Sequence, residues 1–125
     1  MEIILILGLI IVILGLMILI KVLVFFALAL QQAIKTNKQK LLHDLVKRED
    51  RLWEYSEKIG EKVMGSKVLN FYEYLSFLYL ENIIDKEMTK KLFKPELIKN
   101  YDKFKKYIKP EFNNLKKLYG LFKQK

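Results

Sequence analysis

Few side chains in this 125-residue chain could carry catalysis or hold a metal ion. There is one histidine, His43, and no cysteine, which excludes thiolate metal sites, cysteine nucleophiles and any centre that needs two histidines. His43 and Asp44 are neighbours in the sequence, so on a helix their side chains do not face each other. Glu73 and Glu81 can share a helix face, yet no loop has a calcium-type ligand spacing and no phosphate-binding or zinc motif is present. We therefore expect no catalytic residues, no metal site and no cofactor.

Lysine supplies the strongest chemical signal. The formal net charge is +9, from 23 Lys+Arg against 14 Asp+Glu. Residues 1–85 are electrically balanced, whereas residues 86–125 hold 13 lysines and four acids and so carry the whole surplus. We expect this basic third to contact an anionic partner through lysines on the outer faces of its last two helices: Lys99, Lys103, Lys106, Lys116 and Lys117.

Three kinds of anionic partner fit the lysine-rich region. Lipid headgroups are the nearest anions if the chain is tethered to a membrane, and each lysine near an anionic surface contributes about 1 kcal/mol of attraction. An acidic protein is the second kind. Nucleic acid is less favoured, because arginine, which can make paired hydrogen bonds to phosphates and bases, occurs only as Arg48 and Arg51, outside the basic third. Genome composition or the charged surface of a thermophile's protein would also produce such a surplus without any partner.

An N-terminal apolar segment would hold the chain beside lipid. Residues 3–30 contain one ionisable group, Lys21, and Ile3–Ile20 are all apolar or glycine. About 20 apolar residues span a hydrocarbon core, and the full segment would form a helix about 42 Å long, which exceeds the thickness of the core. Because a lysine at mid-bilayer costs roughly 3 kcal/mol, we place Ile3–Ile20 across the core. A tilted span that reaches Leu28 is the alternative.

The flanks of this segment predict its orientation. No basic side chain precedes it. Basic flanks stay cytoplasmic, and five basic residues follow within about 20 positions: Lys35, Lys38, Lys40, Lys47 and Arg48. We expect a single-pass protein of the cell (inner) membrane with its N-terminus outside and residues 31–125 in the cytoplasm. A cleaved signal peptide is the alternative, although the apolar run is long and Glu2 stands where a basic residue is usual.

Two glycines on the span favour self-association. Gly8 and Gly15 are seven residues apart and lie on one helix face, where small side chains let two helices approach closely. Membrane lipids and a second copy of the chain are therefore both expected partners. A pore formed by the oligomerised span is an alternative, in which Lys21 would be the one polar side chain available to line it.

The soluble part predicts an all-α fold, because sustained alternation of apolar and polar residues is absent and helix breakers are sparse. We divide the chain into a transmembrane anchor over residues 1–30, an amphipathic juxtamembrane helix and linker over residues 31–65, and a helical bundle with a basic C-terminal third over residues 66–125. The cytoplasmic bundle is expected to contain about four helices. No breaker separates its first helix from the span, so the two can form one long helix.

Glycine positions predict where the juxtamembrane helix ends, and a dense run of apolar residues predicts the central helix of the bundle. Gly60 and the pair Gly65-Ser66 are expected to end the juxtamembrane helix and to begin a linker. Residues 67–84 are apolar around most of a helix circumference, which is typical of a central bundle helix. We expect Glu73, which lies among aromatic residues of this helix, to pair with a lysine of a later helix.

One aspartate and two prolines predict the remaining helix boundaries. Asp85 suits the N-cap of a short helix that ends near Phe93, because its carboxylate can accept a bond from the free amides of the first turn. Pro95 and Pro110 suit helix starts. We expect the last two helices over residues 96–109 and 111–124.

Several short motifs resemble those of a known family. They are Leu69-Asn-Phe-Tyr-Glu73, Ile84-Asp85-Lys-Glu87, Leu92-Phe93, Tyr101 and Leu118-Tyr119-Gly-Leu-Phe122. Over residues 50–122 the chain is similar to a family of small prokaryotic membrane proteins of unassigned function, with one N-terminal span and a compact helical cytoplasmic domain. The resemblance implies the tethered bundle and implies no catalytic residue.

Taken together, the patterns predict a membrane-tethered, non-catalytic interaction or scaffolding protein. Its basic helical domain would face anionic lipid or an acidic protein partner in the cytoplasm. A membrane-active protein that forms a pore through its span is one alternative, and a membrane-anchored nucleic-acid-binding module is another.

Overall fold

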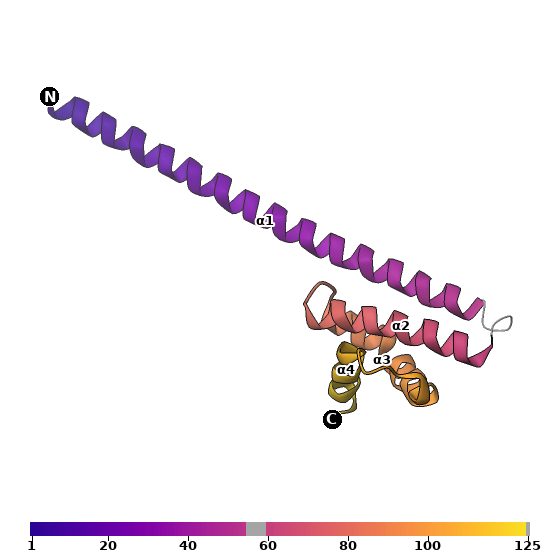
Figure 1. The fold of residues 1–125 in the computed structure, drawn as a ribbon. Helices are drawn as coiled ribbons and strands as arrows, with labels where there is room; N and C mark the ends of the chain where they lie inside the picture. Colours follow the sequence, from indigo (N-terminus) through magenta and orange to yellow (C-terminus); the bar gives the residue numbers. More distant parts are fainter. Residues whose placement is uncertain (55–59, 125) are drawn as a thin grey trace. The chain divides into compact units, whose positions relative to one another are not determined.

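The computed structural model describes residues 1–54 and 60–124 (Figure 1). Within these ranges all regular structure is helical, which confirms the predicted all-α class. Four α-helices and one 3₁₀ helix follow one another along the described chain: α1 (Glu2–Glu54), α2 (Glu61–Leu80), α3 (Lys86–Lys103), η1 (Lys105–Tyr107) and α4 (Asn113–Lys123).

The first helix, α1, is uninterrupted over 53 residues, as the absence of a breaker after Leu30 predicts. It contributes to two compact units, the first formed by residues 1–37 and the second by residues 38–125. In the first unit every large apolar side chain from Ile3 to Leu30 is exposed. Of the helices that are described, α1 is the one long and apolar enough to cross a membrane.

The core of the second unit is centred on α2. This helix buries ten residues, and α3, η1 and α4 all contact it. The C-terminal part of α1 adds Leu42 and Leu45 to the same core. Residues 67–84 were expected to supply the central helix because they are apolar on most sides, and the packing of several helices around α2 confirms that expectation.

The linker predicted at Gly65 and Ser66 is wrong, because both residues lie inside α2. Part of the predicted juxtamembrane segment, residues 61–65, therefore belongs to a bundle helix. Close packing explains the glycine: a Cβ atom at Gly65 would lie 2.8 Å from ring carbons of Phe104 and Tyr107. Gly65 lets these rings approach the backbone of α2, and this contact offsets the cost of about 1 kcal/mol that glycine adds to a helix interior.

The C-terminus of α2 comes at Leu80, before the expected residue 84. Asn82 has a left-handed backbone conformation, with φ of 60°. The amide of Asn82 donates to the carbonyl of Tyr79, and the amide of Ile83 donates to the carbonyl of Leu78. These two bonds form a Schellman motif, in which a residue with positive φ ends the helix and satisfies its last carbonyls.

The third helix begins as predicted and then continues further. The Asp85 side chain accepts a hydrogen bond of 2.8 Å from the amide of Met88, which confirms the N-cap. The break expected at Pro95 is wrong, because α3 passes through it to Lys103 as one helix. An interior proline costs about 3 kcal/mol. Phe93 and Leu97, on either side of Pro95, are 1% and 0% exposed, and their burial offsets that cost.

A matched pair of glycine substitutions tests the packing at the start of α2. Gly65→Ala should lower the free energy of unfolding by about 1–3 kcal/mol, because the added Cβ overlaps two aromatic rings. Gly120→Ala in α4 meets no heavy atom within 4 Å and should raise stability by up to about 1 kcal/mol. Thermal unfolding of the full chain in a nonionic detergent, followed by near-ultraviolet circular dichroism, measures both. Equal effects of the two substitutions would contradict the close contact at Gly65.

Candidate interaction surface

The predicted helix start at Pro110 is wrong. Pro110 lies in a turn, and α4 begins at Asn113. The N-cap residue, Phe112, has no side-chain acceptor for the free amides of the first turn. A helix end in such a position needs an acceptor from elsewhere in the molecule.

Glu73 of α2 supplies that acceptor. Its Oε1 atom accepts hydrogen bonds from the backbone amide and the side-chain amide of Asn114, both at 3.1 Å. Its Oε2 atom accepts one from the amide of Leu115 at 2.6 Å. The expected pairing of Glu73 with a lysine is therefore wrong: the carboxylate meets the positive end of the α4 dipole instead. This interaction fixes the start of α4 against the central helix.

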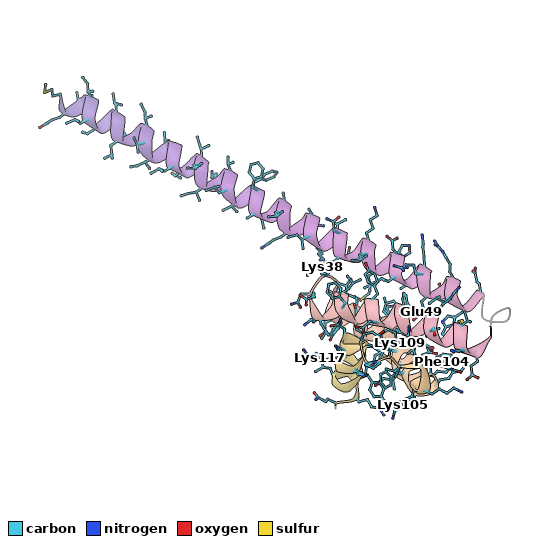
Figure 2. The ribbon with its side chains drawn as sticks, in the orientation of Figure 1. Lys38, Glu49, Phe104, Lys105, Lys109 and Lys117 are labelled. Atoms are coloured by element: carbon cyan, nitrogen blue, oxygen red, sulfur yellow. The ribbon has the colours of Figure 1, made fainter. Side chains whose placement is uncertain are left out.

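The fourth helix presents two of the predicted lysines outward. Leu115, Leu118 and Phe122 are buried, whereas Lys116 and Lys117, on the same helix, are exposed. Figure 2 shows Lys117 at the outer side of α4. In the described ranges neither lysine forms an ion pair with a carboxylate. Lys116 and Lys117, here called the α4 lysine pair, thus place two positive charges at the surface of α4.

The predicted lysines of α3 have acidic neighbours. Lys99 and Lys103 are exposed, and both line a cavity of about 440 Å³ together with Glu49 and Glu96. Trp53 and Asn100 complete the cavity lining. The carboxylates reduce the positive potential at this position, so this cavity is a mixed-charge site and a weaker anion site than the charge count along the sequence indicates.

Lys106 follows α3 in the short helix η1. Its Nζ atom lies 4.0 Å from Oε1 of Glu61, and both side chains are more than 60% exposed. An exposed ion pair of this length contributes little to stability. The same Nζ lies 5.1 Å from the ring centroid of Tyr107. The structure therefore does not place the five predicted lysines on one uniform basic surface.

A partly buried polar cluster that the sequence analysis did not identify joins α1, α2 and α3. The Tyr72 hydroxyl donates to Oε2 of Glu49 at 2.7 Å, and it accepts a longer hydrogen bond, 3.4 Å, from Nδ2 of Asn100. Burial raises the pKa of the Glu49 carboxyl and that of the Tyr72 hydroxyl above their usual values. The sequence carries one signal for the cluster: Asn100 falls between Leu97 and Phe104 on the buried face of α3.

Gly8 and Gly15 of the predicted self-association face lie in the first unit. A Cβ atom at either position would meet no heavy atom within 4 Å. Both glycines are exposed, so their helix face is free in this single chain. Self-association through them stays a prediction.

Among the residues described, no group of three or more histidine, aspartate or glutamate side chains is placed to hold a metal ion.

A comparison with known protein families identifies the family of the chain. A family model described as a domain of unknown function, DUF4760, matches residues 3–123. The match includes the apolar segment as well as the bundle, so it extends the resemblance predicted for residues 50–122. No curated protein and no solved structure matches the chain.

Two substitutions at Glu73 test how α4 is positioned. Glu73→Ala should lower the free energy of unfolding by roughly 2–4 kcal/mol, because three donors lose a charged acceptor. Glu73→Gln keeps one acceptor oxygen and should cost about half as much. Chemical denaturation of the full chain in detergent measures both variants. If alanine and glutamine had the same small effect, the carboxylate would not cap α4.

Proposed function

We propose, for a chain that belongs to the DUF4760 family, that α1 anchors it in a membrane and that the second unit is a non-catalytic interaction module beside that membrane. One observation carries the proposal. All 23 large apolar side chains between Ile3 and Leu30 are exposed, although α1 is a regular helix there.

Water is a poor environment for this part of α1. Burying one large apolar side chain is worth roughly 1.5–3 kcal/mol, so leaving all of them in water forfeits tens of kcal/mol. The apolar residues are consecutive and face every direction, so one neighbouring helix would cover only one side. A hydrocarbon core covers all sides at once, and Ile3–Ile20 are long enough to cross it. Lys21 then lies near the headgroups, where its amine can reach water.

Charge supports an orientation with the second unit in the cytoplasm. The chain has no basic side chain before Ile3, and four lysines follow the apolar segment on α1 before residue 48: Lys35, Lys38, Lys40 and Lys47. Basic flanks are retained on the cytoplasmic side. The chain would therefore have its N-terminus outside and residues 31–125 in the cytoplasm.

The α4 lysine pair is the part of the module best suited to an anionic partner. It is exposed, its helix is fixed by Glu73, and no carboxylate in the described chain neutralises it. Anionic lipid is the partner that a tethered module meets first, and each lysine near the surface would add about 1 kcal/mol. An acidic protein is the alternative. Lys99, Lys103 and Lys106 add charge less effectively because of their acidic neighbours.

Cysteine labelling tests the anchoring and the orientation, since the chain has no native cysteine. In intact cells a membrane-impermeant maleimide should label Glu2→Cys and should not label Gly120→Cys. After permeabilisation both variants should react. Labelling of Gly120→Cys in intact cells would contradict the orientation, and recovery of both labelled variants in the soluble fraction would contradict the anchor.

A polarity-sensitive dye tests contact between α4 and lipid. Gly120→Cys places the dye next to the α4 lysine pair without removing a lysine, and Lys62→Cys on the first turn of α2 is the control. The full chain is reconstituted in phosphatidylcholine vesicles with or without phosphatidylserine. We expect the emission of the dye on α4 to shift to shorter wavelength when phosphatidylserine is present, and the emission of the control dye to stay unchanged. High salt should reverse the shift. Identical emission in both membranes would remove the lipid role and leave the acidic protein as partner.

A further inference from the structure

A second cationic site lies away from the lysine-rich third, between the C-terminal part of α1 and α2. It is a groove of about 430 Å³. Both of its walls belong to the second unit, and Figure 1 shows the end of α1 running alongside α2. From α1 come Arg48, Arg51 and Leu52, and from α2 come Lys67, Asn70, Phe71 and Tyr74. We call this site the arginine groove.

The arginine groove contains both arginines of the chain. The chain has 23 Lys+Arg, of which Arg48 and Arg51 are the two arginines, and both line this groove. Lys67 lines it from the other helix, and no acidic residue is among the lining side chains that the structure describes. In the described ranges none of the three cations forms an ion pair. Three cationic side chains thus line one groove.

The lining of the groove also includes aromatic and apolar side chains. The Arg48 guanidinium carbon lies 5.4 Å from the centroid of the Tyr74 ring. A guanidinium held over a ring keeps its N–H groups available for a second, anionic partner. Phe71 and Leu52 add apolar surface, and the Asn70 amide can both donate and accept hydrogen bonds. The groove therefore combines an anion-binding end with a surface for a flat or apolar group.

We propose that the arginine groove binds a soluble small molecule that carries phosphate on an organic body. Arginine suits this ligand because its planar fork binds two phosphate oxygens at once, and a second arginine and a lysine match a polyanionic phosphate. The organic body would lie against Leu52, Phe71 and Tyr74. The volume of about 430 Å³ falls within the range of small-molecule sites.

This site is independent of the proposed lipid contact. The groove contains none of Lys99, Lys103, Lys106 or the α4 lysine pair. A test can therefore disprove the membrane anchor without disproving ligand binding, and the reverse also holds. A ligand held between α1 and α2 would bridge the helix that leads to the apolar segment and the central helix of the bundle.

Titration calorimetry on the full chain in a nonionic detergent tests the proposal, with adenosine triphosphate as the probe and no divalent cation present. We expect binding that weakens as salt is added. Adenosine, which lacks phosphate, should show no binding, and inorganic pyrophosphate, which lacks an organic body, should bind at least tenfold more weakly. Binding of adenosine, or equal affinity for pyrophosphate and the nucleotide, would overturn the proposal.

Two charge-matched double variants localise the binding. Arg48→Gln with Arg51→Gln should weaken nucleotide affinity at least tenfold, and both side chains are exposed, so the fold should persist. Lys105→Gln with Lys109→Gln removes the same charge from exposed side chains outside the groove and outside α4, and it should leave affinity unchanged. Near-ultraviolet circular dichroism verifies folding, and Lys67→Gln provides a single-site check from the opposite wall. Equal losses in both double variants, or no nucleotide binding by the native chain at millimolar concentration, would refute the site.

Discussion

A helix whose apolar side chains face every direction needs an apolar environment on every side. Residues 3–30 of α1 form such a helix, and no other described part of the chain covers them. The second unit has a core of its own, built around α2, and does not depend on the apolar segment for burial. The chain thus combines a segment suited to hydrocarbon with a folded unit suited to water, and our functional account follows from that combination.

Polar side chains in the second unit determine how its helices are placed. Glu73 holds the start of α4, and the Glu49–Tyr72 hydrogen bond joins the end of α1 to the central helix. Gly65 lets η1 and the end of α3 pack closely on α2. These contacts leave the α4 lysine pair and the arginine groove at the surface, on different elements. The structure therefore offers two separate cationic sites, where the charge count along the sequence indicates one.

Local sequence signals predicted the features that depend on neighbouring residues. The long α1, the wide apolar surface of α2 and the Asp85 N-cap all follow from residue type and spacing. Pro95 misled the prediction because burial of its flanking residues outweighs the break, and that burial depends on distant helices. The partners of Glu73 lie more than 40 residues away, so no local pattern could indicate them. The arginine groove was missed for the same reason: Lys67 joins Arg48 and Arg51 only through the packing of α2 on α1.

Extraction of cell membranes with alkaline carbonate tests the central claim most directly. The account predicts that the native full-length chain stays in the membrane pellet and is released only by detergent. A variant with Ile10→Lys and Leu14→Lys places two charges in the apolar segment, each costing roughly 3 kcal/mol at mid-bilayer, and it should move to the soluble fraction or be degraded. Recovery of the native chain as a dispersed monomer without detergent would contradict the account.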